Sequence, residues 1–175
     1  MAAGDFKPGP LGYAILLRAL PGALAAGFAL ERRHVAAGIC LVLAVWADVA
    51  VGFLAGRMGW RKGDSQIQLE GLVDFLCFVV APIVFCVTLD SSRVVALSSL
   101  LFLLCGAYRI ARFNVEGLNE KGGYTGLPVT YNGYWFPLIA LLEPYHPLAP
   151  NLVWGGVLLL LSLLMTTRNL NVPEL

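Results

Sequence analysis

Six stretches of the chain are almost wholly apolar, and short polar segments separate them. A helix that crosses a bilayer needs about 20 apolar residues, because the hydrocarbon core is about 30 Å thick. The pattern therefore predicts six transmembrane helices, at residues 11–30, 34–56, 66–89, 92–114, 128–143 and 151–167. The first stretch ends in small residues, as a signal peptide does, but Arg18 and Pro21 interrupt it and favour an uncleaved span.

The composition also indicates an integral membrane protein. Of the 175 residues, 58% are hydrophobic and 13% are charged, whereas soluble domains are about 25% charged. Six helices with short loops use the whole length, so we expect residues 1–175 to form a single all-α membrane domain. A net charge of +1 provides no basic tract for nucleic acid. The four cysteines lack the paired spacing of zinc sites and are expected to be small core residues.

Lysine and arginine are unevenly divided between the two ends of the predicted helices. Nine lie at the N-terminus, at the exits of even-numbered helices or at the C-terminus: Lys7, Arg18, Arg57, Arg61, Lys62, Arg109, Arg112, Lys121 and Arg168. Only Arg32, Arg33 and Arg93 lie at the opposite ends. Because positive residues are retained on the cytoplasmic side, both termini are predicted to be cytoplasmic.

Asp48 is a carboxylate inside the second apolar stretch. The predicted topology places it in the cytoplasmic half of its helix, level with Glu70 and Asp74 in the third helix. Arg109 and Arg112 end the fourth helix on the same side. Ionisable residues at membrane depth usually face a bundle interior or an aqueous cavity and mark a functional site. The alternatives are ion pairs between packed helices and, for the arginines, ordinary anchoring at the cytoplasmic surface.

Helical spacing favours a shared pocket for these groups. Asp48, Gly52 and Ala55 stand at i, i+4 and i+7 and line one helix face, while Glu70 and Asp74 line another. Clustered carboxylates repel unless a cation lies among them, and Mg²⁺ takes oxygen ligands and commonly bridges to a substrate phosphate. Arginines suit phosphate oxygens. The residues therefore predict metal-assisted phosphoryl transfer at the cytoplasmic membrane face, on a lipid that bears a phosphate.

Two motifs in this region resemble those of the CDP-alcohol phosphotransferase family, whose signature reads D-x-x-D-G-x-x-A-R, a spacer, and G-x-x-x-D-x-x-x-D. The chain reads DVAVGFLAG at residues 48–56 and QIQLEGLVD at 66–74. Residues 108–128, YRIARFNVEGLNEKGGYTGLP, are similar to the R-x-A-R-F-N…G-L-P region of the phosphatidylserine synthase branch. FVVAP at 78–82 resembles the same branch, so the similarity extends from the second to the fifth helix.

The resemblance implies a homodimer with six transmembrane helices per chain, and two divalent metals, Mg²⁺ or Mn²⁺, held by the four motif aspartates. The family transfers a phosphatidyl-type group from a CDP-linked lipid to a small alcohol and releases CMP. By position, Asp48 matches the first metal ligand, and Gly52 and Ala55 match the small residues beside the cytidine. Asp74 matches the last aspartate, which is a metal ligand and the general base.

Four of the eight signature positions differ from the family pattern: Val51, Gly56, Gln66 and Glu70. Glu70 can still ligate a metal, although its extra methylene moves the oxygens by about one bond length, whereas Val51 cannot ligate. The expected metal ligands are therefore Asp48, Glu70 and Asp74. Arg109, Arg112 and Asn114, in the region that keeps the branch pattern, are expected to contact the substrate.

Three functions are compatible with these observations. The one we favour is a phosphatidyltransferase of membrane phospholipid biosynthesis with a weakened metal site, which uses CDP-diacylglycerol and an alcohol, with serine as the expected acceptor. The second is a family member that has lost catalysis and binds a lipid or a partner. The third is a small transporter or channel subunit whose charges line a pathway. The third lacks the repeat symmetry and interrupted helices of many transporters.

Overall fold

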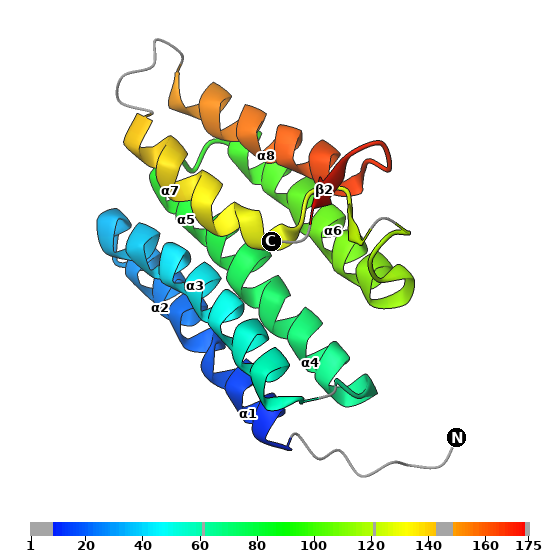
Figure 1. Ribbon diagram of the computed structural model, residues 1–175. Helices are drawn as coiled ribbons and strands as arrows, with labels where there is room; N and C mark the ends of the chain where they lie inside the picture. The colour runs from blue at the N-terminus through cyan, green and yellow to red at the C-terminus, as the bar shows by residue number, and fades with distance from the viewer. Residues whose placement is uncertain (1–8, 61, 121, 143–148, 174–175) are drawn as a thin grey trace.

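The chain folds into a bundle of helices that run side by side (Figure 1), and the computed structural model describes residues 9–60, 62–120, 122–142 and 149–173. In chain order the elements are α1 (Gly9–Leu17), α2 (Ala19–Leu30), α3 (His34–Met58), α4 (Asp64–Phe75), the π-helix η1 (Leu76–Val80), α5 (Ala81–Leu89), α6 (Arg93–Glu116), β1 (Gly123–Thr125), the 3-10 helix η2 (Val129–Tyr131), α7 (Asn132–Leu142), α8 (Pro150–Thr166) and β2 (Asn171–Pro173).

Four helical stretches of the described chain are long and apolar enough to cross a membrane: Gly9–Leu30, His34–Met58, Asp64–Leu89 and Arg93–Glu116. Each of these helices begins and ends within about two residues of the predicted position. Differences of this size are usual, because helix termini fray. The helix α8 is apolar but has 17 residues, and α7 ends at Leu142, the last described residue before a gap. These helices confirm the prediction of an α-helical membrane protein. Lys7, Arg61, Lys121 and Glu143 lie outside the described residues.

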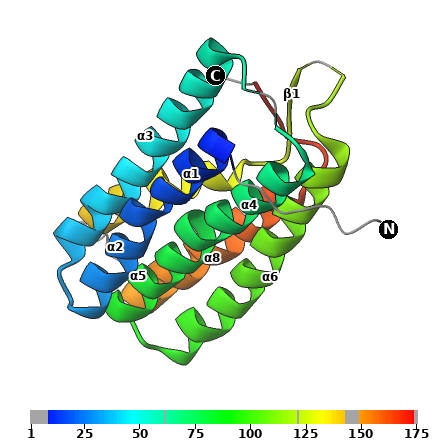
Figure 2. The same cartoon turned by 90° about the horizontal axis from the view of Figure 1, so that it is seen from below.

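An aromatic cluster joins four helices in the core. Phe85 of α5, Phe102 of α6, Phe136 of α7 and Trp154 of α8 are all almost fully buried. The Phe136 and Trp154 rings stack with centroids 6.4 Å apart, and Phe102 meets Phe136 edge-on at 5.6 Å. Such pairs add about 0.5–1.5 kcal/mol each beyond the apolar area that they bury. The cluster fixes α7 between α5, α6 and α8, and both views show α6 and α8 side by side (Figures 1 and 2).

A two-stranded sheet outside the helices was not predicted from the sequence. Strands β1 and β2 pair antiparallel, with Gly123 opposite Pro173 and Thr125 opposite Asn171. Each strand has three residues, which is too short to show the alternation of apolar and polar residues that marks a strand. The sheet ties the loop after α6 to the segment after α8.

The first apolar helix is interrupted at Arg18, between α1 and α2. Pro21 explains the interruption, because proline has no N–H to donate to the carbonyl four residues earlier, at Leu17, and its ring crowds that carbonyl. Arg18 itself still donates its backbone N–H to the Ala14 carbonyl, at 3.1 Å. The break is therefore local, and it falls at the one charged residue of the span.

A second proline shapes the third apolar helix. Pro82 cannot donate to the Phe78 carbonyl, and the helix widens to the π form at Leu76–Val80 just before it. The freed Phe78 carbonyl accepts a hydrogen bond from Asn132 Nδ2, at 2.8 Å. Asn132 is fully buried at the start of α7. The FVVAP motif thus corresponds to a π-helical segment that a buried asparagine completes.

Small residues let neighbouring helices press against this π-helix. A Cβ atom at Gly22 of α2 would overlap the Cys77 sulfur, and one at Gly106 of α6 would lie 2.7 Å from a Val79 methyl. Close approach at small residues is how helices pack within membranes. All four cysteines are free and three are buried, as predicted: Cys40, Cys77 and Cys86, with Cys105 partly buried.

We expect Asn132→Ala to lower the free energy of unfolding by about 1–3 kcal/mol, because it leaves the buried Phe78 carbonyl without a donor. Denaturant titration of the purified protein in detergent, followed by far-ultraviolet circular dichroism, measures the change. Asn169→Ala, at an exposed position after α8, is the matched control and should stay within about 0.5 kcal/mol of the parent protein. Equal stability of the two variants would refute the role given to Asn132.

Candidate active site

Three carboxylates and one arginine meet at one place between the first three apolar helices. Arg18 Nη1 forms an ion pair with Asp48 Oδ1, and Arg18 Nη2 lies 2.7 Å from Asp74 Oδ1 and 3.8 Å from Glu70 Oε1. The Arg18 side chain is 2% exposed, whereas the three carboxylates are 21–24% exposed. We call Arg18, Asp48, Glu70 and Asp74 the charged cluster. Its guanidinium is buried while its carboxylates still reach solvent.

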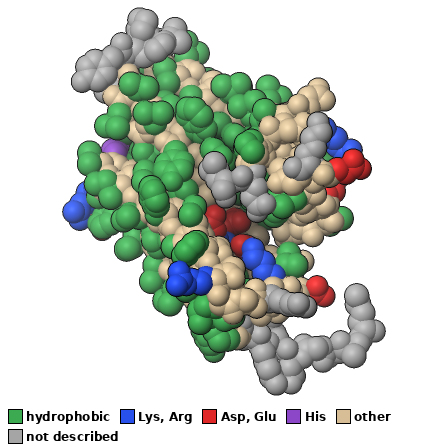
Figure 3. Space-filling model, viewed as in Figure 1, with side chains coloured by type: hydrophobic (Ala, Val, Ile, Leu, Met, Phe, Trp, Pro, Cys, Tyr) green, Lys and Arg blue, Asp and Glu red, His purple; other side chains and the backbone are tan. Residues whose placement is uncertain are grey.

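Two further polar residues border the charged cluster. Lys62 Nζ lies 2.6 Å from Glu70 Oε2, and the Thr130 hydroxyl of η2 donates to Asp48 Oδ2 at 3.4 Å. Figure 3 shows acidic and basic side chains gathered in a recess on a face that is otherwise largely hydrophobic. Three carboxylates against Lys62 and Arg18 leave one negative charge. The net charge of the recess is therefore close to zero without any further ion.

The local sequence explains why these side chains converge. Figure 2 shows α1 between α3 and α4, so the break at the end of α1 brings Arg18 between the helices that carry the carboxylates. Glu70 and Asp74 stand one helical turn apart on α4 and therefore present both carboxylates to the same neighbour. Asp48 meets the same guanidinium from α3.

The predicted residues that neighbour Asp48 have different surroundings. Gly52 is exposed, and a Cβ atom there would meet nothing within 4 Å. Ala55 is 6% exposed and belongs to the core. Val51, where the family pattern has an aspartate, is half-buried and packs against the core. The backbone one turn after Asp48, at Gly52, is therefore open to solvent or lipid, and a ligand could approach it closely.

Arg109 and Arg112, which were expected to contact the substrate, are buried against main-chain carbonyls. Arg109 Nε donates to the Leu127 carbonyl at 3.2 Å. Arg112 donates to the carbonyls of Thr125, at 2.7 Å, and Thr166, at 3.0 Å. The two arginines thus hold the loop before η2 and, through Arg112, the last turn of α8. Their role as substrate ligands stays a prediction.

Gly126 completes this contact. Its φ of +79° lies in the region that favours glycine, and a Cβ atom there would lie 2.7 Å from the Met165 carbonyl and 2.9 Å from Arg112 Nη2. Its N–H donates to the Leu170 carbonyl at 2.7 Å. The R-x-A-R and G-L-P parts of the branch pattern therefore bind each other in the fold.

Asn114, the third residue expected to contact the substrate, lies away from the charged cluster. It lines a groove of about 270 Å³ between α4 and α6 that also includes Gln68, Gly71 and Phe75. These α4 residues are on average roughly 110° around the helix from the carboxylates, at about 100° per residue. Asn114 and the charged cluster therefore face different sides of α4.

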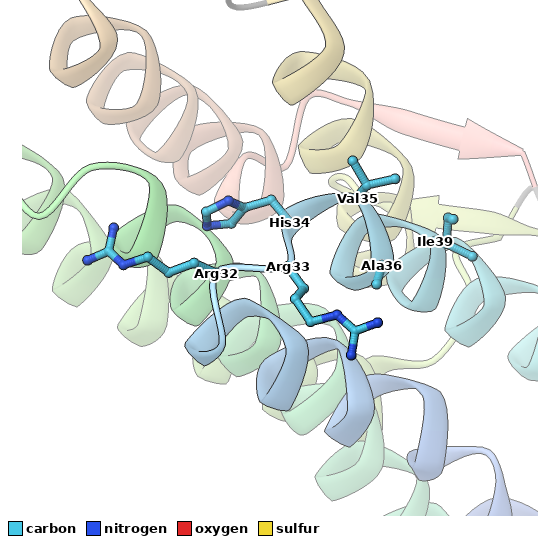
Figure 4. Close-up of a pocket in the computed structure, with 6 residues that line it drawn as sticks. All are labelled: Arg32, Arg33, His34, Val35, Ala36 and Ile39. Carbon is cyan, nitrogen blue, oxygen red and sulfur yellow. The ribbon is translucent and has the colours of Figure 1, made fainter.

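An open hollow of about 490 Å³ lies at the turn between α2 and α3 (Figure 4). Arg32 and Arg33 line it but point away from one another. Arg32 donates to the Thr88 carbonyl at 3.2 Å, and Arg33 lies 3.7 Å from Glu31. Asp48 is nine residues beyond Ile39, the lining residue furthest along α3, or about 13 Å, so this hollow lies apart from the charged cluster.

Sequence reasoning missed Arg18, Lys62 and Thr130 as members of the site. Arg18 was interpreted as an interruption of the first apolar stretch and as a positive charge near the cytoplasmic surface. The available signal was its position within an apolar span, where an ionisable residue by itself indicates a functional site. Lys62 lies in a connecting segment and Thr130 at the start of the predicted fifth helix, and no sequence pattern marks either residue.

The charged cluster as arranged does not fit a divalent metal. Its three carboxylates are the oxygen donors that Mg²⁺ prefers, but the Arg18 guanidinium lies among them. Across the described parts of the chain, no group of three or more His, Cys, Asp or Glu side chains is placed to hold a metal ion. The metal predicted from the sequence stays a prediction.

The fold and the charged cluster describe an α-helical integral membrane protein with paired charges between its first helices. No family model matches the chain. It is 34% identical over 89 residues to CDP-diacylglycerol–serine O-phosphatidyltransferase of Methanocaldococcus jannaschii, across 51% of this chain and 42% of the relative. It is 30% identical over 146 residues to the enzyme of that name from Helicobacter pylori strain J99, across 76% of this chain and 61% of the relative.

These matches confirm the resemblance found in the motifs. The chain is related to the phosphatidylserine synthase-like branch of the CDP-alcohol phosphotransferases. It spans about half the length of the curated relatives that it matches, between 42% and 61%.

Proposed function

We propose that the chain transfers a phosphatidyl group from CDP-diacylglycerol to a small alcohol and releases CMP, as part of membrane phospholipid biosynthesis. The observation that carries the proposal is the meeting of Asp48, Glu70 and Asp74 in one partly exposed recess. Serine is the proposed acceptor, because the relatives are named as serine phosphatidyltransferases.

In the proposed reaction the acceptor hydroxyl oxygen attacks the phosphorus next to the diacylglycerol. The bond between that phosphorus and the bridging oxygen breaks, and CMP leaves with the oxygen. Asp74 takes the proton of the hydroxyl as a general base. The exposed backbone at Gly52 leaves space for the nucleotide beside Asp48.

A second candidate is a related protein that binds a CDP-linked lipid without turnover. The observation that favours it is the pairing of Arg18 with Asp74, because a base already bound to a guanidinium is less free to meet a substrate hydroxyl. Val51 adds to this, since it removes a carboxylate from the family pattern.

We also propose that the domain has six transmembrane helices, with both termini and the charged cluster at the cytoplasmic side, and that it works as a homodimer. Arg32 contacts Thr88, so the α2–α3 turn and the end of α5 lie at one end of the bundle. Arg168 contacts Glu116 at the opposite end of α6. This arrangement supports the charge bias from which the orientation was predicted.

Cysteine-accessibility mapping tests the orientation. A single cysteine placed at Arg168 should react with an impermeant reagent only from the cytoplasmic side, and one placed at Arg32 only from the opposite side. Because the native cysteines would also react, all four are first replaced by alanine. Labelling of the two positions from the same side would contradict the topology.

Release of CMP tests the transfer itself. Purified protein is incubated with CDP-diacylglycerol and serine, or with other small alcohols, with Mn²⁺, Mg²⁺ or a chelator. We expect CMP release with at least one alcohol. No release with any alcohol, while CDP-diacylglycerol still binds, would favour the binding protein over the enzyme.

Val51→Asp restores the second aspartate of the family pattern, one turn from Asp48 on α3. We expect it to tighten Mn²⁺ binding on the order of tenfold, since affinity rises with the number of charged ligands, and to raise CMP release. Val49→Asp, at an exposed position of the same helix, is the matched control and should change neither. Unchanged metal binding in Val51→Asp would show that position 51 does not face the site.

A further inference from the structure

We propose that Arg18 is the resident cation of the charged cluster, and that its guanidinium fills the place among Asp48, Glu70 and Asp74 where a divalent metal would bind. The inference deepens the proposed function and rests on it for the identity of the site. It makes Arg18 a positioning residue that holds the carboxylates together, and it predicts that a divalent ion competes with Arg18 for these carboxylates and binds the parent protein weakly.

The contacts of Arg18 are those of a bridging cation. One Nη group pairs with Asp48 of α3 and the other with Asp74 of α4, so a single guanidinium joins carboxylates from two helices. Its side chain is 2% exposed, and burial of an unpaired arginine there would be very unfavourable. Arg18 Nε has no hydrogen-bond partner among the described residues. The ion pairs therefore fix the side chain, as they would fix a bound ion.

The backbone around Arg18 holds it in this position. The break caused by Pro21 places Arg18 at the junction of α1 and α2. Gly22, one turn further on, lies directly against Cys77, which follows Asp74 in the same continuous helix. The Cys77 thiol also approaches the Ala19 carbonyl, at 3.9 Å. The helix that carries Arg18 is thus packed tightly against the helix that carries two of the carboxylates.

The charge balance leaves no need for a divalent ion. With Arg18 and Lys62 present, the three carboxylates retain one negative charge. A divalent ion added beside Arg18 would place two cations in contact, and their repulsion is large at so short a separation beside a buried guanidinium. Without Arg18 the remaining charge would be minus two, which one divalent ion neutralises. The replacement of a family aspartate by Val51 fits this balance, since fewer carboxylates need fewer positive charges.

Mn²⁺ titration of the purified protein in detergent tests the inference, with the free aqueous ion followed by electron paramagnetic resonance. The comparison uses the parent protein, Arg18→Gln, and Arg93→Gln as a matched control at the exposed start of α6. We expect Arg18→Gln to bind Mn²⁺ at least about tenfold more tightly than the other two, because it removes a charge in contact with the ion. Parent protein that binds Mn²⁺ as tightly as Arg18→Gln would overturn the inference.

Thermal unfolding with Mn²⁺ or with a chelator gives a second readout, which also reveals a variant that folds poorly without metal. Mn²⁺ should raise the unfolding temperature of Arg18→Gln and of Arg18→Met and should leave that of the parent protein unchanged. If neither variant folds, the parent protein decides: stabilisation of it by Mn²⁺ overturns the inference, and its indifference to Mn²⁺ supports it.

These measurements do not use turnover, so the two proposals fail separately. Absence of CMP release with no Mn²⁺ binding by the parent protein would reject the transfer and leave the role of Arg18 standing. CMP release together with tight Mn²⁺ binding by the parent protein would reject the role of Arg18 and leave the transfer standing.

Discussion

Asp74→Asn is expected to lower CMP release by a factor of about 10²–10⁴, because a general base contributes an effect of this size and asparagine cannot take the proton of the acceptor hydroxyl. Asparagine keeps the shape of the side chain, so the fold should survive. The measurement is the rate of CMP release at saturating CDP-diacylglycerol and acceptor, together with the unfolding temperature of each protein.

The matched control for this variant is Asp64→Asn, on the same helix at its exposed first position. It makes the same chemical change away from the charged cluster and should release CMP at the parental rate. Turnover by Asp74→Asn close to that of the parent would reject Asp74 as the base, whereas a low rate with a collapsed unfolding temperature would assign Asp74 to stability through its pair with Arg18.

Arg112→Met is expected to lower the free energy of unfolding by at least about 3 kcal/mol. The variant removes the donor to the carbonyls of Thr125 and Thr166, and each hydrogen bond from a charged group contributes about 1.5–3 kcal/mol. Methionine keeps the apolar part of the side chain, so the loss of stability measures the contribution of the guanidinium group. Denaturant titration in detergent measures the change.

Arg168→Met is the matched control, since Arg168 is exposed and its charged partner within the described part of the chain is Glu116, at 3.4 Å. A surface pair of this kind is worth about 0–1 kcal/mol. Should Arg112→Met prove as stable as this control while losing CMP release, Arg112 would act on the substrate, as the sequence predicted, and the carbonyl contacts would be secondary.

The apolar pattern predicts the long helices well because the bilayer sets their length and leaves few alternatives. The spacing of Glu70 and Asp74 likewise places both carboxylates on one side of α4, where the structure has them. Arg18 was not predicted to belong to the site, because the retention of positive residues on the cytoplasmic side already explained its charge. Its three partners lie 30 to 56 residues away in the chain, and no local pattern records such distances.

The roles of Arg109 and Arg112 show a different limit. Both were expected to contact substrate because arginines near a membrane surface suit phosphate, yet both donate to main-chain carbonyls. Every residue has a carbonyl, so the sequence contains no sign of which one an arginine will bind. For the same reason Asn132, whose partner is the Phe78 carbonyl, could not be identified before the fold was known.

The loop between α6 and η2 depends on residues that are synthesised much later. The N–H groups of Gly126 and Leu127 bind the carbonyls of Leu170 and Leu164, and β1 has β2 as its partner. During translation the partners of this loop emerge from the ribosome about 40 residues after the loop itself. Until then the N–H groups of Gly126 and Leu127 lack the carbonyls that they bind in the folded protein. The G-L-P region therefore completes folding only after α8 and β2 have been synthesised, although it lies in the middle of the similarity to the family.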